Sequence, residues 1–246
     1  MKWITITMTA LALTTFGQAQ AQELTALEVL KKGDSVVNAP KDQDLKMKLI
    51  LIDKDGDEKE REARMLQKGS DKRMIKFLSP ADQRGIAFLD LPGDIMYLYL
   101  PAFKKVRRIA GHIKNQKFAG TDFTYDDMGT LNYAEEYDPK FIEKTEEFFV
   151  LELTPKKGIK KDYSKLKMWV RKDNFYPEKI EYFDKSGRLW KTSERRRIEK
   201  LGNYWVSKEF EIHDLKEDHR TKSILEEVKF DTGLEDKLFT KRYLKR

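Results

Sequence analysis

The chain has no cysteine and only three histidines among its 246 residues. Without cysteine there can be no disulfide framework, no thiol nucleophile and no thiol to carry a lipid anchor. The histidines, His112, His213 and His219, lack the spacing of a metal site, and no Gly-x-Ser-x-Gly turn marks a serine hydrolase. We therefore expect no catalytic residues, no metal and no cofactor, and we interpret the protein as a non-enzyme.

Neither sign of charge dominates the sequence. It combines 49 lysines and arginines with 42 aspartates and glutamates, for a net charge of +7. Because acidic residues dilute the basic ones along nearly every segment, nucleic acid is a poor partner. An anionic membrane surface and an acidic protein surface both remain open as partners.

Long hydrophobic runs are missing beyond the first 21 residues. Residues 1–21 have the pattern of a secretory signal peptide, with Lys2 ahead of an apolar run over 4–16 and a small-x-small site at 19–21. The run is about 13 residues long, whereas a membrane-spanning helix needs roughly 20. We expect cleavage after Ala21, which leaves residues 22–246 as a single domain of an exported protein.

Apolar spacing predicts one helix followed by many strands. Residues 24–37 place leucines and valines near helical spacing, and Asn38-Ala39-Pro40 ends the segment. From residue 44 the period changes to two, so that Leu45, Met47, Leu49 and Leu51 share one strand face. Turn signals separate further predicted strands at 61–67, 73–78, 148–153, 166–171, 177–182, 188–197, 204–214 and 221–230. Strands without helices between them indicate an antiparallel meander.

Such a one-sided sheet has to cover its apolar face. Only the helix at 24–37 and the irregular stretch at 109–128 are available for this. A strongly curved sheet closed by a helix and a loop would enclose an apolar interior. That interior is either an ordinary packed core or a ligand cavity, and periodicity alone does not decide between them.

A basic group follows an aromatic strand in the middle of the chain. Lys104, Lys105, Arg107 and Arg108 come directly after the segment Tyr97-Leu98-Tyr99-Leu100-Pro101. They are candidates for contact with an anionic headgroup or an acidic partner surface, and ordinary solvated charge is the alternative. The run at 195–197 is interpreted as solvated charge that protects a sheet edge.

The segment Thr121-Asp122-Phe123-Thr124-Tyr125-Asp126-Asp127 predicts a short helix. We expect Thr121 or Asp122 to cap a helix through residues 123–128, whose dipole the later aspartates stabilise. Phe123 and Tyr125 would then be core residues or the floor of a cavity. A metal site at the paired aspartates would need oxygen ligands from elsewhere, and none is identifiable.

Several of these segments together resemble the outer-membrane lipoprotein-sorting protein family, relatives of the periplasmic lipoprotein carrier LolA. The resemblance lies at residues 77–80 with Gly85, 97–101, 104–109, 118–127, 179–184 with Gly187, 221–230, 239–240 and Leu244. It covers nearly all of residues 22–246. The fold that it implies is a mainly β half-barrel, a strongly curved antiparallel sheet with helices and a lid over its concave face.

The function that the resemblance implies is binding of lipid or acylated cargo in the periplasm. Some relatives accompany envelope transporters of the resistance-nodulation-division (RND) type, so an accessory module that docks on such a transporter without carrying lipid is the alternative. We expect a monomer. Gly111, Gly120 and Gly129 flank the expected lid and are candidate hinges. The candidate cavity residues are Leu45, Met47, Leu49, Leu51, Tyr97, Tyr99, Phe123, Tyr125 and Trp169.

Overall fold

The computed structural model describes residues 23–129 and 132–246, so the expected signal peptide lies outside the described residues. Helical elements are α1 (Ala26–Val37), α2 (Tyr125–Met128), α3 (Tyr133–Glu136), α4 (Lys241–Leu244) and the 3-10 turns η1 (Pro101–Phe103), η2 (Gly111–Ile113) and η3 (Asp236–Leu238). None of the described helices has the length and apolar character needed to cross a bilayer.

The strands are longer on average in the middle of the sheet than at its edges. They are β1 (Asp42–Ile52), β2 (Glu58–Lys68), β3 (Lys72–Ser79), β4 (Ala87–Leu91), β5 (Ile95–Leu100), β6 (Lys105–Arg108), β7 (Tyr137–Lys144), β8 (Phe148–Pro155), β9 (Lys165–Arg171), β10 (Pro177–Phe183), β11 (Leu189–Leu201), β12 (Tyr204–Asp214) and β13 (His219–Phe230). The strands predicted from periodicity are all present. β4, β6 and β7 were not predicted.

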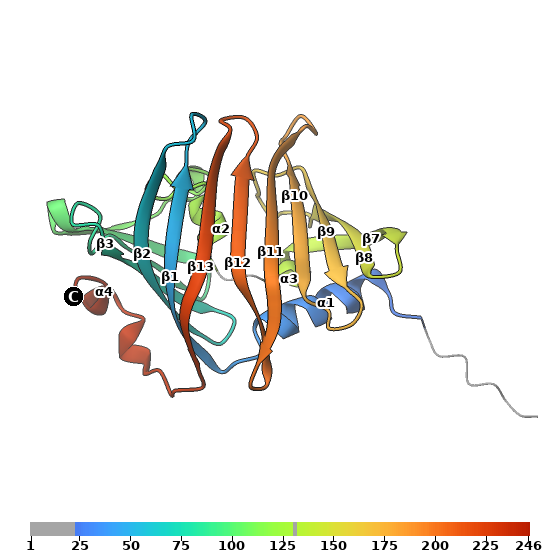
Figure 1. Cartoon of the computed structure of the whole chain (residues 1–246), viewed down its shortest axis with the longest axis horizontal. Helices are drawn as coiled ribbons and strands as arrows, with labels where there is room; N and C mark the ends of the chain where they lie inside the picture. Colours follow the sequence, from blue (N-terminus) through green and yellow to red (C-terminus); the bar gives the residue numbers. More distant parts are fainter. Residues whose placement is uncertain (1–22, 130–131) are drawn as a thin grey trace, which may run out of the picture.

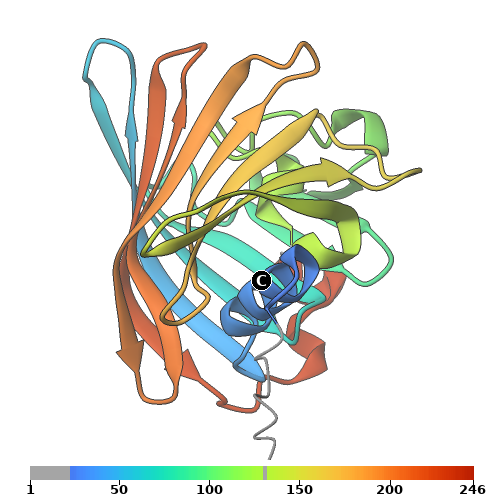
Figure 2. The same cartoon turned by 90° about the vertical axis from the view of Figure 1, so that its right-hand side faces the viewer.

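All described strands belong to one antiparallel sheet with the order β6-β5-β4-β3-β2-β1-β13-β12-β11-β10-β9-β8-β7. The chain runs outward from β1 to the edge strand β6, crosses to the other edge through residues 109–136, and returns from β7 to β13 (Figure 1). Figure 2 shows the sheet curving strongly, with α1 inside the curve. The predicted half-barrel is confirmed.

Helix α1 fills the β7–β10 half of the concave side. It begins at Thr25, whose hydroxyl accepts from the Glu28 amide while the Glu28 carboxylate accepts from the Thr25 amide, a capping box that satisfies two free backbone donors. Val29 and Leu30 are fully buried against the strands. The helix predicted at 24–37 is therefore confirmed, and its apolar stripe closes one end of the half-barrel.

The irregular stretch at 109–128 covers the opposite half of the concave side. Phe118 lies over the sheet with its ring 5.3 Å from that of Phe77 and 6.0 Å from that of Phe88. All three rings are fully buried, together with apolar residues of β1, β2 and β5. The two expected covers thus occupy separate halves of the sheet and leave space between them.

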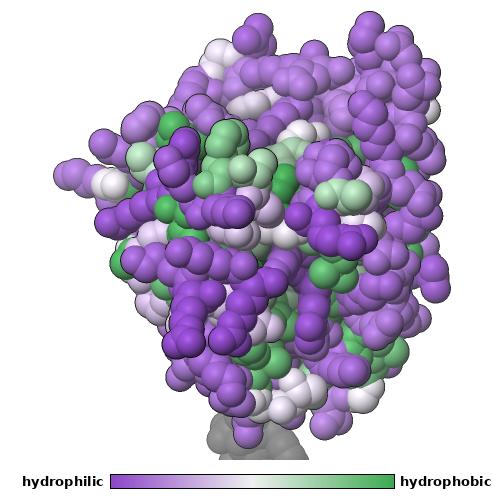
Figure 3. Space-filling model, turned by 90° about the vertical axis from the view of Figure 1, so that its left-hand side faces the viewer, coloured by the Kyte–Doolittle hydropathy of each residue, from purple (hydrophilic) through white to green (hydrophobic). Residues whose placement is uncertain are grey.

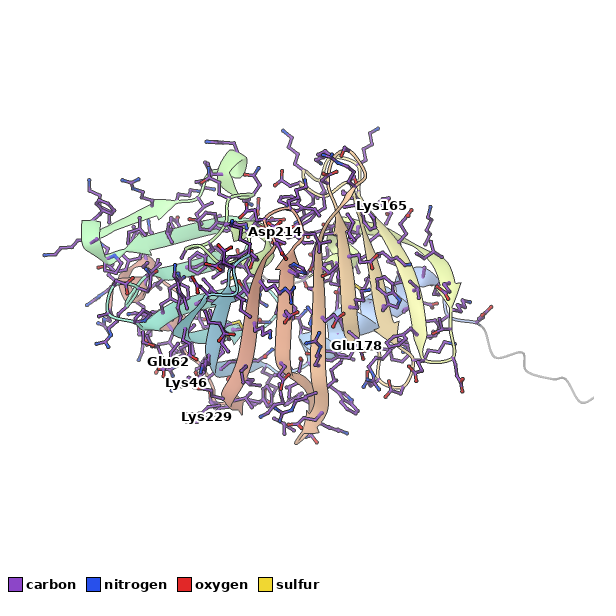
Figure 4. All side chains as sticks on the ribbon, turned by 45° about the horizontal axis from the view of Figure 1, so that its top comes forward. Lys46, Glu62, Lys165, Glu178, Asp214 and Lys229 are labelled. Atoms are coloured by element: carbon purple, nitrogen blue, oxygen red, sulfur yellow. The ribbon has the colours of Figure 1, made fainter. Side chains whose placement is uncertain are left out.

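The convex side has a cover that the sequence reading missed. Leu66, Met74 and Leu89 are buried beneath Phe239 and Leu244 of the C-terminal segment. Elsewhere this face carries ion pairs between neighbouring strands, such as Lys46 with Glu62 at 3.6 Å and with Glu226 at 3.2 Å. Figure 4 labels Lys46, Glu62 and Lys229 on this face. Among the described residues, the buried apolar cluster of the convex side therefore lies under the C-terminal segment.

Replacement of Leu30 by alanine tests the contribution of α1. Leu30→Ala removes a buried side chain and leaves a void, so the free energy of unfolding should fall by about 2–5 kcal/mol. The matched control is Leu27→Ala on the same helix, whose side chain is 39% exposed and whose effect should stay within about 0.5 kcal/mol. Urea unfolding followed by circular dichroism measures both; equal effects would contradict the packing described.

Candidate functional site

A cavity of about 1250 Å³ lies between the concave side of the sheet, the loop at 109–129 and helix α3. Its apolar wall comes from alternate residues of adjacent strands, because residues two apart on a strand share a face. Cross-strand partners continue this wall from strand to strand: Leu49 pairs with Ser223, and Met47 pairs with Leu225. Further apolar lining residues are Leu45, Met65, Ile75, Phe210, Ile212 and Val206.

The rim of the cavity is polar and exposed. It is formed by the β4–β5 turn at 92–94, by η2 and by the loop at 158–161. Lys161 lies 3.0 Å from Asp126 and 2.7 Å from Glu136, so it links the loop to α3. Burial raises the pKa of Asp126 and of Glu136, and Lys161 opposes this rise. The loop at 109–129 and α3 are therefore joined by a charged contact beside the opening.

Six of the nine candidate cavity residues lie on the concave side. Leu45, Met47, Leu49 and Phe123 line the cavity directly, and Phe123 stacks on Phe210 with ring centroids 5.6 Å apart. Leu51 and Tyr125 lie deeper in the same apolar cluster, where the ring of Tyr125 stacks on that of Phe88 at 6.4 Å. The face assigned to residues 45–51 from their alternation is therefore the inner face.

The other three candidates lie on the convex side, and their assignment was wrong. Tyr97 and Tyr99 pack under the C-terminal segment, with Lys241 over the Tyr97 ring at 5.2 Å. Trp169 lies between the ammonium groups of Lys167 and Lys179, each 4.6 Å from its ring centroid. Strand neighbours of these aromatic residues, such as Met96 and Met168, face inward instead.

Two of the three candidate hinge glycines line the cavity, whereas the four candidate basic residues lie at the edge of the sheet. Gly111 and Gly129 line the cavity, and Gly120 has a φ of +77° at a turn. A Cβ on Gly129 would approach the Met96 Cε to 3.0 Å and the Asp126 carbonyl oxygen to 3.3 Å, so a larger residue here would displace its neighbours by a few tenths of an ångström. The basic residues Lys104, Lys105, Arg107 and Arg108 are exposed on and just before the edge strand β6, away from the cavity lining.

Arg73, which the sequence reading did not select, is buried in the cavity wall. Its guanidinium donates to Gln67 Oε1 at 2.7 and 3.0 Å and to the carbonyl oxygens of Met128 and Gly129. Burial lowers its pKa to about 10, although Asp90 acts in the other direction. The sequence could have predicted this position. Arg73 precedes the inward-facing Ile75 and Phe77 by two and four residues, so all three side chains lie on the same face of the strand.

Asp122 binds the loop at 109–129 to β13, at the centre of the sheet. It is fully buried, and its carboxylate accepts from Thr221 Oγ1 at 2.8 Å, from His219 Nδ1 at 2.6 Å and from Lys117 Nζ at 3.1 Å. Its own amide donates to Thr221 Oγ1 at 3.0 Å. The expectation that Asp122 caps a helix was wrong, because its oxygens are engaged with β13 instead.

The cap of the short helix is Thr124. Its hydroxyl accepts from the Asp127 amide at 3.1 Å, and the Asp127 carboxylate accepts from the Thr124 amide at 2.9 Å. Asp127 also accepts from the Tyr163 hydroxyl at 3.0 Å and lies 3.5 Å from the ammonium of the fully buried Lys191. The helix is shorter than predicted, Tyr125–Met128, and its acidic residues hold it against the sheet.

Three solved structures share this fold over nearly their whole length. A DUF1329 family protein from Desulfovibrio piger is 28% identical, with a TM-score of 0.83 and coverage of 89% of this chain and 97% of that one. A putative outer membrane lipoprotein-sorting protein domain from Vibrio parahaemolyticus is 29% identical (TM-score 0.76, coverage 88% and 100%). A LolA superfamily protein from Nitrosomonas europaea is 26% identical (TM-score 0.76, coverage 90% and 100%).

A family model described as "Uncharacterized protein" matches residues 69–246. The chain belongs to the LolA-like family of outer-membrane lipoprotein-sorting proteins. No curated protein matches it. The resemblance drawn from the sequence motifs is thus confirmed, and the LolA-like chain keeps the half-barrel of its structural neighbours. The region that the family model matches includes the loop at 109–129, the basic residues at 104–108 and β13.

Asp34 joins the two helices at the inner end of this LolA-like chain. Its Oδ2 accepts from the Ala134 amide at 2.7 Å, so a residue of α1 holds the start of α3. Burial raises the pKa of Asp34 to about 6, the Ala134 and Tyr133 amides oppose this rise, and the charges of Glu135 and Glu136 add to it. The contact between the helices therefore depends on pH in the range just below neutrality.

Asp34→Asn tests this dependence. Because the folded pKa of about 6 exceeds the ordinary value of 3.8, the stability that Asp34 contributes is complete below pH 3.8 and lost as pH rises through 6. Asparagine keeps the acceptor without the charge, so at pH 8 the variant should be roughly 2 kcal/mol more stable than the wild type. The advantage should vanish near pH 4.

Urea unfolding at intervals between pH 4 and pH 8 measures the difference. The control is Asp138→Asn, whose side chain is exposed and whose curve should follow that of the wild type. A constant difference between Asp34→Asn and the wild type across this range would show that the α1–α3 contact does not titrate.

Proposed function

We propose that this protein is a periplasmic carrier that binds lipid or acylated cargo in its cavity and transfers it across the envelope. The observation that carries the proposal is the cavity itself. Its volume of about 1250 Å³ exceeds the roughly 300–1,000 Å³ typical of small-molecule sites. Its wall is mainly aliphatic and aromatic, which suits an acyl chain, and its rim is polar, which suits a headgroup.

The energetics favour a cargo that is buried only in part. Enclosing an acyl chain gains about 0.8 kcal/mol per CH₂, so roughly 16 carbons would contribute on the order of 12 kcal/mol. Three such chains would exceed the practical limit of about 20 kcal/mol for non-covalent binding. The polar groups of Gln43, Gln67 and Arg73 in the wall reduce this gain, which allows release to a better acceptor.

Entry of a large cargo requires the loop to move. We propose that Gly111, Gly120 and Gly129 permit this movement, because glycine adopts backbone conformations that other residues resist. The hydrogen bonds from Arg73 to the carbonyls of Met128 and Gly129 would have to break as the loop opens. Lys161, between Asp126 and Glu136, would then lose one of its partners.

An accessory module that docks on an RND-type transporter without lipid is the alternative. That function needs no internal space, and a tightly filled interior would favour it. The large cavity favours the carrier. An RND-type transporter is still proposed as a partner that could deliver or accept the cargo, with the carrier acting as a monomer and without catalysis.

We propose that the basic edge, which consists of Lys104, Lys105, Arg107 and Arg108, binds anionic headgroups. Lys104, Lys105, Arg107 and Arg108 are exposed beside Phe103, whose side chain is 63% exposed. Each basic residue near an anionic leaflet adds about 1 kcal/mol of attraction, and an exposed aromatic ring can enter the headgroup region. Figure 3, which faces this side of the molecule, shows apolar groups between hydrophilic side chains.

Filling the cavity tests the carrier function. Ser223→Trp places a large side chain in the wall opposite Leu49, so the affinity for a fluorescent acyl probe should fall at least about tenfold, or 1.4 kcal/mol. The control is Lys222→Trp, the next residue along β13, whose side chain points to the convex face. Equal affinity for Ser223→Trp and the wild type, or no probe uptake by the wild type, would refute a carrier that uses this cavity.

Charge reversal tests the basic edge. The double variant Arg107→Glu/Arg108→Glu should bind vesicles of phosphatidylglycerol and phosphatidylcholine at least about tenfold more weakly than the wild type at low salt. High salt should shrink the difference, because exposed charges are screened. Lys229→Glu is the control, an exposed charge on the convex face of β13. Co-sedimentation measures binding, and equal loss for the control would indicate attraction by net charge alone.

A further inference from the structure

Arg195 is a buried cation with unused donors inside the cavity. It lies on β11 directly opposite Phe210 of β12, and both side chains line the cavity. Its side chain is 9% exposed. One nitrogen, Nη1, donates to the Pro177 carbonyl at 3.2 Å, and the guanidinium carbon lies 5.0 Å over the Phe210 ring. A guanidinium has five N–H donors, and the hydrogen bond to the Pro177 carbonyl uses one of them.

The described residues give Arg195 no carboxylate within ion-pair distance. The next two arginines, by contrast, each form an ion pair on the outer face. Arg196 lies 2.6 Å from Glu194, and Arg197 lies 3.0 Å from Glu209. Arg197 has a left-handed φ of +51° within β11. Burying an unpaired charge costs several kcal/mol. The interpretation of residues 195–197 as solvated edge charge was therefore wrong for Arg195, and β11 is an interior strand.

Three tyrosines share the cavity with Arg195 and are close enough to feel its charge. Tyr176, Tyr182 and Tyr133 line the same cavity. Burial raises the pKa of Tyr182 to about 12, and the charge of Arg195 acts against that rise, as it does at Tyr133 and Tyr176. Phenolic hydroxyls can donate to an oxyanion. Arg195 and the tyrosines thus offer hydrogen-bond donors beside the apolar part of the cavity wall.

We propose that Arg195, with the surrounding tyrosines, is the subsite for the anionic head of an amphiphilic ligand whose acyl chain lies along the apolar wall. The ligand class is a lipid with one oxyanion, a carboxylate or a phosphodiester, since the planar guanidinium fork matches both in a bidentate manner. This inference rests on the proposed carrier function and narrows its cargo from lipid in general to anionic lipid bound head-inward.

Competition between matched ligands tests the subsite. Dodecanoate and dodecanol share a chain and differ in charge, as do dodecanoyl lysophosphatidylglycerol and monododecanoylglycerol. Each displaces a neutral fluorescent acyl probe from the delipidated protein. At least one anionic ligand should bind about tenfold or more tightly than its neutral partner. Which pair shows the preference identifies the head as carboxylate or phosphodiester.

Variants assign the preference to Arg195. Arg195→Met should abolish it while neutral chains bind as before, and Arg195→Lys should keep part of it. Arg196→Met, on the outer face of the same strand, should keep all of it. A preference that survives Arg195→Met, or equal binding of anionic and neutral partners to the wild type, overturns the subsite and leaves the carrier function standing. Failure of every chain to displace the probe, or to bind at all, overturns the carrier function itself.

A measurement on the wild type decides the matter if Arg195→Met does not fold. Dodecanoate labelled with ¹³C at its carboxyl carbon, bound to the protein, reports its own ionisation by NMR across pH. A guanidinium beside the head lowers the pKa of the bound carboxyl below that of the free ligand, whereas an apolar site raises it. Titration at or above the value of the free ligand overturns the subsite.

Discussion

The attachment of Asp122 to β13 determines how the concave side of this protein is covered. A fully buried carboxylate is tolerable only when hydrogen bonds and a cation surround it. His219 and Thr221 of β13, together with Lys117 of the loop itself, meet that requirement. The loop is therefore fixed there. With its polar segment fixed, Phe118 comes to rest on Phe77 and Phe88, and the rest of the concave face stays open.

The cavity follows from that placement. Helix α1 and its partners fill the β7–β10 half, the loop covers the β1–β5 half, and the cavity lies between these two covers. The space and the buried guanidiniums of Arg73 and Arg195 that line it set this interior apart from an ordinary packed core, because a packed core carries few charges.

The sequence predicts the architecture better than the site. Alternation identified the inner face of residues 45–51, since Lys46 and Lys48 mark the outer face unambiguously. It failed for Tyr97, Tyr99 and Trp169 because both faces of their strands are covered, by the C-terminal segment and by lysine stems. Arg195 was missed for a related reason. Three consecutive arginines do not reveal which of them faces the interior of the sheet. Only the pairing of Arg195 with Phe210 shows that Arg195 does.

The strand order has a consequence for how the chain folds. β1 and β13, the first and last strands, are neighbours at the centre of the sheet, whereas β6 and β7, consecutive along the chain, form its two edges. Each half of the chain can build its own meander from local hairpins, but the halves join through pairs such as Leu45 with Val228. Contacts so distant in sequence form slowly. Until they form, two apolar concave surfaces face water, and the chain passes through its most aggregation-prone state before its cavity exists.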